Sequence, residues 1–198
     1  PPKLAPIQVV IVPIYRSDEE LELVTKKGDE IFNTLKAAGI RVKFDTRDTH
    51  KPGFKFAEYE LKGVPLRITV GPRDLANNQI EIARRDNREK SLIDADINSD
   101  AINNTLDEIQ KWLFDRAKDH QETHITSVDT WDDFKEALET KTGFISAHWD
   151  GSGETEQKIK EATKATIRCI PLDNKQEAGA CVFSGNPSTQ RVLFAKAY

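Results

Sequence analysis

The chain has 198 residues, and its composition of 37% hydrophobic and 31% charged residues is typical of ordinary folded domains. A formal net charge of −4 excludes a protein that coats nucleic acid indiscriminately, so any RNA binding must use a local patch. Two cysteines are too few for a disulfide framework, and no apolar run approaches the roughly 18 residues of a membrane span, so we expect a cytoplasmic protein of two small domains.

The chain begins at Pro1 without an initiator methionine or a signal peptide, which indicates a piece of a longer protein. Residues 7–12 (IQVVIV) form a nearly continuous apolar run, as expected for a strand that is covered on both faces. A capping box at residues 17–20 predicts the start of an amphipathic helix that ends before Gly39. The alternation in residues 40–44 predicts a second strand, parallel to the first.

Residues 55–74 are the stretch of the sequence that says most about structure and function. Its first part is rich in residues that favour a helix, and Gly63 predicts where this helix ends. A strand at 66–70 follows, in which the alternation places Arg67 and Thr69 on a face that we expect to be open to a partner. A turn comes next, so we expect several charged residues to converge on one surface: Glu60, Lys62, Arg67, Arg73 and Asp74.

Such a cluster of mixed charge suits the edge of an unstacked base. A carboxylate can accept hydrogen bonds from the N1–H and N2–H₂ groups of guanine, and an Arg or Lys beside it can donate to O6 or N7. A cluster of this kind also occurs as a salt-bridged surface at the end of a helix. The pattern alone leaves both interpretations open.

Two further strands, at 79–84 and 91–93, are predicted around a turn at 86–89. The basic residues beside this turn have two interpretations that are equally favoured. They could contact phosphates, or they could form a charged strand edge that prevents aggregation. From Ser99 a 3.6-residue apolar period predicts a long helix to about Lys118, which should close the first domain. The basic residues beside the turn are Arg84, Arg85, Arg88 and Lys90.

Residues 119–128 are polar and poorly periodic, which indicates the connection between the two domains. The remaining residues predict a small α/β domain of helices and strands. The expected elements are a helix from Thr130, a strand at 143–149, a helix at 154–164, a strand at 165–172, and short strands at 180–183 and 191–197.

Three stretches together resemble a known family: PPKLAPIQVVIVPIYR at the start, KFAEYELKGVPLRITVGPRD in the middle and RVLFAKAY at the end. The sequence resembles prolyl-tRNA synthetases of the archaeal/eukaryotic-like type over essentially its whole length. The resemblance implies an α/β fold in which residues 1–118 form a class II synthetase anticodon-binding domain, a mixed sheet with flanking helices. Residues 119–128 would then be a linker, and residues 129–198 a small α/β C-terminal domain that is similar to a zinc-binding domain whose ligands are lost.

The resemblance also implies roles for individual residues. In this family the anticodon-binding domain reads the two guanines that all proline anticodons share. The residues that match this reading surface are Glu60, Arg67, Arg73 and Asp74. A further basic residue of the family aligns ambiguously in the following hairpin, and we assign it to Lys90. The family's terminal tyrosine directs its free carboxylate toward the catalytic domain, a role that falls on Tyr198.

Members of this family activate proline with ATP and Mg²⁺ and attach it to tRNA, so the resemblance implies a proline–tRNA ligase as the full-length protein. This chain lacks the catalytic domain, and we expect it to be inactive alone and to need no cofactor itself. The expected partners are proline tRNA and the protein's own catalytic domain. Dimerisation is expected through that domain, so the present chain could be monomeric, and neither a membrane nor DNA is expected as a partner.

The sequence leaves two alternatives to this function. The first is a stand-alone, non-catalytic RNA-binding or regulatory module derived from a synthetase. The second is a nucleotide-binding β-α-β protein, which is disfavoured because residues 13–15 (PIY) stand where a glycine-rich turn is needed.

Many members of the family carry two cysteine pairs in the C-terminal domain, which suit a structural zinc ion. A lone His on a strand, here His148, is more often structural than a replacement ligand. Cys169 belongs to an alternating strand pattern and is expected in the core. We predict no zinc, because one sulfur remains at the four matching positions, which are Asp150, Thr155, Cys181 and Ser184.

Overall fold

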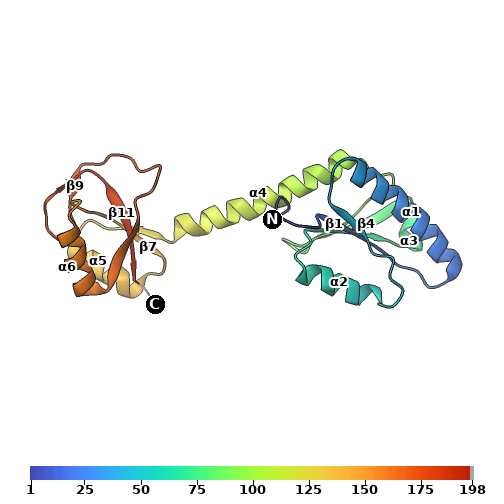
Figure 1. Ribbon diagram of the computed structural model, residues 1–198, viewed down its shortest axis with the longest axis horizontal. Helices are drawn as coiled ribbons and strands as arrows, with labels where there is room; N and C mark the ends of the chain where they lie inside the picture. Colours follow the sequence, from blue (N-terminus) through green and yellow to red (C-terminus); the bar gives the residue numbers. More distant parts are fainter. Residues whose placement is uncertain (197–198) are drawn as a thin grey trace. The chain divides into compact units, whose positions relative to one another are not determined.

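The computed structural model describes residues 1–196, which form two compact units, one from Pro1 to Asp115 and one from Arg116 onward. Each unit has its own β-sheet (Figure 1). Each unit also has its own hydrophobic core. Within residues 1–196, no helix is both long and apolar enough to cross a membrane.

The first unit is built on five strands, β1 (Val9–Pro13), β2 (Val42–Phe44), β3 (Leu66–Val70), β4 (Gln79–Arg84) and β5 (Lys90–Asp94). They form one sheet in the order β2-β1-β3-β4-β5. Strand β1 runs parallel to β2 and β3, whereas β3, β4 and β5 pair in antiparallel fashion. The mixed sheet confirms the predicted fold class, and the parallel β1–β2 pair confirms the predicted β-α-β unit.

Helices cover both faces of this sheet. They are α1 (Asp18–Ala37), α2 (Pro52–Leu61), the short α3 (Pro72–Leu75) and α4 (Ser99–Thr123). As predicted, Ser17 caps α1, and its Oγ accepts the N–H of Glu20 at 3.2 Å. Gly63 follows α2 with a φ of 74°, a left-handed conformation that glycine adopts without strain and that ends the helix where predicted.

The two faces of the sheet pack against different helices (Figure 1). Leu66 belongs to the large apolar core under α1 and α4, while Val10 packs with Tyr59 of α2 on the other face. Arg67 and Thr69 point to this second face, as predicted. The expectation that their face is open is wrong at β3, because α2 covers it: Thr69 is 4% exposed, and the side chain of Arg67 is 11% exposed.

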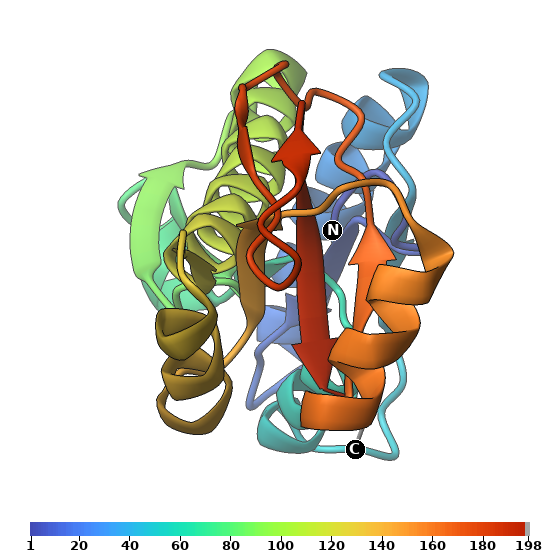
Figure 2. The ribbon, with the colours of Figure 1, turned by 90° about the vertical axis from the view of Figure 1, so that its left-hand side faces the viewer.

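The second unit is built on a four-stranded sheet with β11 near its middle (Figure 2). Its apolar core includes Phe134, Ile159 and Phe194, and each of these side chains is fully buried. The strands are β6 (Ile125–Ser127), β7 (Phe144–His148), β8 (Ala165–Cys169) and β11 (Arg191–Lys196), in the order β6-β7-β11-β8. The helices are α5 (Trp131–Thr140) and α6 (Gly153–Thr163), and a two-stranded ribbon joins β9 (Gly179–Ala180) to β10 (Pro187–Ser188).

Residues 119–128 are more regular than the sequence predicted. Helix α4 continues to Thr123, past the expected end at Lys118, and β6 pairs with β7 in parallel. The pattern missed both elements because the last turns of α4 are exposed on all sides and β6 lies at the edge of its sheet, so neither has an apolar period. The functional boundary between the domains stays a prediction.

The expected strand at 165–172 ends at Cys169, and the expectation that Cys169 lies in the core is wrong, because this residue is exposed. The register between β8 and β11 shifts between Leu193 and Phe194. A bulge of this kind redirects the side chains beyond it. The strand expected at 180–183 is likewise reduced to β9, because the chain turns at Cys181, whose carbonyl accepts the N–H of Gly185.

The four positions that match the family's cysteine pairs lie close to one another in the second unit. Cys181 is 3% exposed, and Asp150 is bonded to two of the other three positions. The donors to the Asp150 carboxylate are Thr155 Oγ1 (2.9 Å), Ser184 Oγ (2.6 Å), Asn186 Nδ2 (3.2 Å) and the backbone N–H of Ser152 (3.0 Å). Within residues 1–196, no group of three or more His, Cys, Asp or Glu could hold a metal ion. That the protein binds no zinc stays a prediction.

Candidate nucleic-acid interface

Three charged side chains lie in a row on the face of the sheet that packs against α2. The strand register pairs Arg67 with Ala83, Thr69 with Glu81, and Ala83 with Lys90. Paired residues project to the same side of a sheet, so Arg67, Glu81 and Lys90 share this face. Glu81 joins the other two, because its Oε1 lies 3.3 Å from Arg67 Nη2 and its Oε2 lies 3.5 Å from Lys90 Nζ.

Helix α2 places an aromatic ring against Arg67. The central carbon of the Arg67 guanidinium lies 3.7 Å from the centroid of the Phe56 ring, which is a cation–π contact. A guanidinium that stacks flat on a ring keeps N–H groups available at its edge. The ring and the Glu81 carboxylate together hold Arg67 in one orientation, so its donors are positioned in advance.

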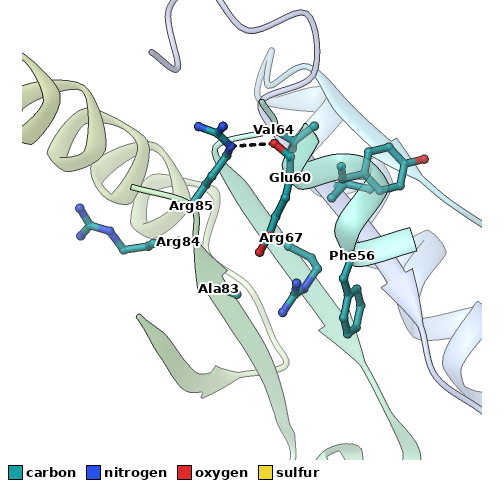
Figure 3. Close-up of a pocket in the computed structure, with 9 residues that line it drawn as sticks. Phe56, Glu60, Val64, Arg67, Ala83, Arg84 and Arg85 are labelled. Carbon is teal, nitrogen blue, oxygen red and sulfur yellow. Dashed lines mark hydrogen bonds between the residues drawn. The ribbon is translucent and has the colours of Figure 1, made fainter. Parts of the chain in front are cut away.

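The last turn of α2 adds a carboxylate to this surface. Glu60 is exposed, and within the described chain its carboxylate has neither a hydrogen bond nor an ion pair. Its backbone carbonyl accepts a hydrogen bond from Arg85 Nε at 2.9 Å. Figure 3 shows the Glu60 side chain extending toward Arg67 in a hollow that Phe56 and Arg85 also line. An unpaired acceptor therefore extends toward the Arg67 guanidinium, while the Arg85 guanidinium lies at the backbone end of Glu60.

Arg73 and Asp74 line a different hollow, at the other end of β3. They follow β3 on the short helix α3, and their neighbours there include Tyr15 and Arg16 from the segment after β1. Within residues 1–196, the side chains of Arg73 and Asp74 have neither a hydrogen bond nor an ion pair. Strand β3 has five residues at about 3.3 Å each, so its two ends lie well apart.

The structure therefore divides the predicted RNA-binding residues into two groups and does not gather them in one place, although this was predicted for Glu60, Arg67, Arg73 and Asp74. We name them the β3-start group, which is Glu60, Arg67 and Lys90, and the β3-end group, which is Arg73 and Asp74. The physical reason for the separation is that the strand between them is extended, whereas the prediction treated the turn after it as a fold back toward α2.

Two of the other basic residues in this region are neutralised by acidic partners. Arg84 Nη2 lies 2.8 Å from Asp86 and Arg84 Nη1 lies 3.2 Å from Glu108. The hydrogen bond to Asp86 raises the pKa of Arg84 above its ordinary value. Lys62 is paired with Glu58 on its own helix. The acidic partners of Arg84 make the hairpin less electropositive than the sequence predicted.

Phe56 and Glu81 line the candidate interface, and the sequence pattern did not assign them to it. For Arg85 the pattern predicted a phosphate contact or a charged strand edge, not a position beside Glu60. Phe56 precedes Glu60 by four residues on a helix, and this spacing places both side chains on one stripe, so a signal for Phe56 was present. The positions of Glu81 and Arg85 depend on the register between β3 and β4. The alternation of Glu81 with an isoleucine on each side fixes the face on which Glu81 lies, but it does not select which residues of β3 and β5 lie opposite, since a slip of two residues keeps the same face.

Comparison with known proteins identifies the first unit. Residues 8–111 match the family model described as an anticodon binding domain. The chain belongs to the anticodon-binding domain family. Both groups of candidate residues lie within the part that this family model matches. Residues 131–198 match a second model, described as the C-terminal part of prolyl-tRNA synthetase.

Curated relatives extend these matches over the whole chain. Proline–tRNA ligases from Flavobacterium johnsoniae, Christiangramia forsetii and Porphyromonas gingivalis are 60%, 57% and 54% identical to it over 198 residues. Each match includes the entire chain, which spans 40% of the length of these relatives. The matches confirm the predicted resemblance to prolyl-tRNA synthetases. Tyr198 lies outside the described residues, and its predicted role stays a prediction.

Proposed function

We propose that this chain recognises the anticodon of proline tRNA and forms the RNA-reading part of a proline–tRNA ligase. The observation that carries the proposal is the unpaired Glu60 carboxylate beside the fixed guanidinium of Arg67. This pair stands in an anticodon-binding domain whose relatives are proline–tRNA ligases. These relatives support the ligase interpretation and give no support to a stand-alone RNA-binding module.

The chemistry of the β3-start group fits guanine. The two oxygens of the Glu60 carboxylate would accept the N1–H and N2–H₂ groups of the base, while Arg67 or Arg85 would donate to O6. Because Phe56 and Glu81 already hold Arg67, little side-chain freedom is lost on binding. A base read in this way contributes roughly 1–3 kcal/mol of discrimination against other bases.

The β3-end group offers the same combination of one acceptor and one donor. Asp74 supplies the carboxylate, Arg73 the guanidinium, and both are unpaired within residues 1–196. Bases of a single-stranded loop are splayed apart, so two separated groups can read two different bases. We therefore assign one guanine of the anticodon to each group.

Lys90 serves the phosphate backbone in this proposal. It is exposed at the edge strand β5, and its ammonium group is 3.5 Å from Glu81, which leaves donors free for a phosphate oxygen. Phosphate contacts position RNA without reading its sequence. Lys90 should therefore contribute to affinity and to salt dependence but not to base preference.

The remaining steps of the ligase reaction belong to the part of the protein that this chain does not span. That part would bind proline, ATP and Mg²⁺, carry out amino-acid activation and transfer, and form the homodimer in the cytoplasm. The Tyr198 carboxylate would be directed toward it. The chain described here recognises and positions the tRNA, and it should have no ligase activity alone.

Equilibrium binding at one fixed salt concentration tests the proposal. The full 198-residue chain is titrated with proline tRNA and with two versions in which one anticodon guanine is replaced. We expect each replacement to weaken binding by roughly fivefold or more, as the loss of one well-read base requires. In Glu60→Gln the preference for one of the two guanines should fall, because an amide offers a donor where guanine also donates.

A matched control removes the same charge elsewhere in the first unit. Glu22 is exposed on α1, and Glu22→Gln should leave both preferences unchanged. Equal binding of the wild-type chain to all three RNAs would leave only phosphate attraction and would overturn the proposal. Unchanged preferences in Glu60→Gln, together with clear discrimination by the wild type, would overturn the assignment of Glu60 alone.

A further inference from the structure

Helix α2 carries Phe56 and Glu60, which line the hollow shown in Figure 3. The two ends of this helix do little to fix its position. Its N-cap residue Lys51 makes no side-chain capping bond, and its first turn contains no acidic residue. Such a helix is a single short element of ten residues that depends on tertiary contacts. The accuracy with which Glu60 is presented therefore depends on what holds α2 against the sheet.

A buried ion pair joins α2 to the sheet. Asp45 and Lys55 are each 2% exposed, and Lys55 Nζ lies 3.0 Å from the backbone oxygen of Asp45 and 3.7 Å from its Oδ1. Asp45 directly follows β2, and its N–H donates to the carbonyl of Ile11 at 2.9 Å. Asp45 therefore belongs to the rigid frame of the sheet, and Lys55 connects α2 to that frame.

Arg47 extends this connection into a network. Its Nε and Nη2 donate to the two oxygens of Asp45 at 2.9 and 2.6 Å, and its Nη2 also reaches Glu58 of α2 at 2.6 Å. Burial by itself would raise the pKa of Asp45, but the hydrogen bonds from Arg47 and the charge of Lys55 hold that pKa well below its ordinary value. The carboxylate therefore stays ionised, and the network persists at neutral pH.

The apolar contacts of α2 fix its position less strictly. Its main buried apolar side chain is Tyr59, which packs with Val10, Val12 and Val64. The Tyr59 hydroxyl is buried without a hydrogen-bond partner in the described chain, and burial raises the pKa of Tyr59 to about 12. Apolar burial has no directional requirement, whereas the hydrogen bonds of an ionic network need a defined distance and angle.

We infer that the Asp45–Lys55 pair, together with Arg47, sets the register of α2 on the sheet and thereby positions Glu60 and Phe56 for reading the base. These are positioning residues, since the pair acts through α2 and does not touch the RNA. The inference rests on the proposed function. Buried ion pairs often contribute little net stability compared with apolar replacements, and fixing a register is their best-attested use. A shift of about 1 Å is enough to break a two-hydrogen-bond contact with a base edge.

The test is Lys55→Met, which keeps an unbranched side chain one heavy atom shorter and removes its charge, while Asp45 keeps Arg47 as its partner. We expect the melting temperature to stay within about 4 °C of the wild type, because removing this buried charge leaves no unpaired ion. The wild-type chain should bind proline tRNA more tightly than the RNA in which the guanine read by Glu60 is replaced. In Lys55→Met this ratio of affinities should be smaller by about threefold or more. Amide hydrogen exchange in residues 53–62 should become faster in the free protein.

Two controls separate positioning from charge and from stability. Lys51→Met removes the same charge from an exposed residue at the start of α2, and it should keep the full preference. Val24→Ala lowers stability through the opposite core and should also keep the preference, since Val24 packs away from α2. If Lys55→Met fails to fold, Arg47→Gln replaces it in the test, because the Arg47 side chain is 40% exposed and Asp45 then keeps Lys55.

The outcomes are distinct. A wild-type chain that discriminates, with a Lys55→Met variant that retains the full preference and the wild-type exchange of α2, would overturn the inference and leave the proposed function standing. Loss of preference in Lys55→Met with retention in both controls supports the inference. A wild-type chain that does not discriminate at all would overturn the proposed function, and the inference with it.

Discussion

The two units of this protein each contain a carboxylate among polar neighbours, and the two carboxylates stand in opposite situations. Glu60 in the first unit is exposed and unpaired within residues 1–196, although it lies in the same hollow as Arg67 and Arg85. Asp150 in the second unit accepts four hydrogen bonds, including one from the backbone of Ser152. Comparing them teaches that proximity of polar groups does not by itself mark a binding site. Unused hydrogen-bonding capacity distinguishes a carboxylate that can bind a ligand from one that holds the fold together.

The largest expected effect is on the stability of the second unit when Asp150 is removed. In Asp150→Ala the hydroxyl of Thr155, a residue that is 7% exposed, loses its acceptor, and Ser152 loses the bond that orders it as the N-cap of α6. Hydrogen bonds to a charged group contribute about 1.5–3 kcal/mol, so we expect the free energy of unfolding of this unit to fall by about 2–3 kcal/mol. Urea unfolding followed by tryptophan fluorescence measures this, since Trp149 itself donates to the carbonyl of Ser152.

Asp173 supplies the control for that experiment. It is exposed and has no hydrogen bond or ion pair in the part of the chain that the structure describes, so Asp173→Ala should change the free energy of unfolding by less than about 0.5 kcal/mol. Equal stability of Asp150→Ala and Asp173→Ala would mean that the four hydrogen bonds contribute nothing net. The contrast between the two carboxylates would then fail.

These two carboxylates also show which features of the structure can be predicted from the sequence. Features that depend on a few adjacent residues were predictable, such as the Ser17 cap and the left-handed Gly63, because local geometry decides them. The approximate position of Glu60 and Arg67 near the end of a helix and the start of a strand followed from the same local signals. Whether a carboxylate is free or bonded depends instead on side chains brought from elsewhere, as Ser184 is brought to Asp150 across 34 positions of the chain.

Strand register limited the rest of the prediction. Glu81 lies between Arg67 and Lys90 only because β4 pairs with β3 and β5 in one register, which alternation alone cannot select. A related limit made the prediction for Cys169 wrong, since β8 has one extra residue between Ile167 and Cys169 relative to β11, and this bulge breaks the alternation that the sequence pattern assumes. The separation of Arg73 from Glu60 had a signal in the extended strand between them, and it was misread as a turn that brings them together.

A smaller effect is expected on the pH dependence of the second unit. Burial by itself would raise the pKa of Asp150, but hydrogen bonds from Ser184, the Ser152 N–H, Thr155 and Asn186 lower that pKa below its ordinary value. A group with a lowered folded pKa contributes stability above the unfolded value of about 3.9, and the contribution is lost as the pH falls through the folded pKa. The stability gap between wild type and Asp150→Asn should therefore be constant above about pH 5 and shrink below about pH 4.

Urea unfolding of both proteins between about pH 3 and pH 7 measures the gap, and subtraction removes the acid sensitivity of the carboxylates that the two proteins share. If the difference in unfolding free energy stays constant down to the lowest pH at which both proteins fold, the negative charge of Asp150 does not strengthen its hydrogen bonds. The hydrogen bonds would then depend only on shape, and the comparison with Glu60 would rest on exposure alone.

The smallest expected effect is the most informative for the first unit. Because the Glu60 carboxylate has no partner within the described chain, Glu60→Ala should change the free energy of unfolding by less than about 0.5 kcal/mol, and alanine in the last turn of a helix has no unfavourable propensity. Thermal and urea unfolding of the chain without RNA measure this. A loss of more than about 1 kcal/mol would mean that Glu60 holds α2 in place, as Asp150 holds α6. A stability that does not change, in a variant that has lost its preference for one guanine, identifies a carboxylate that is maintained for the RNA and not for the fold.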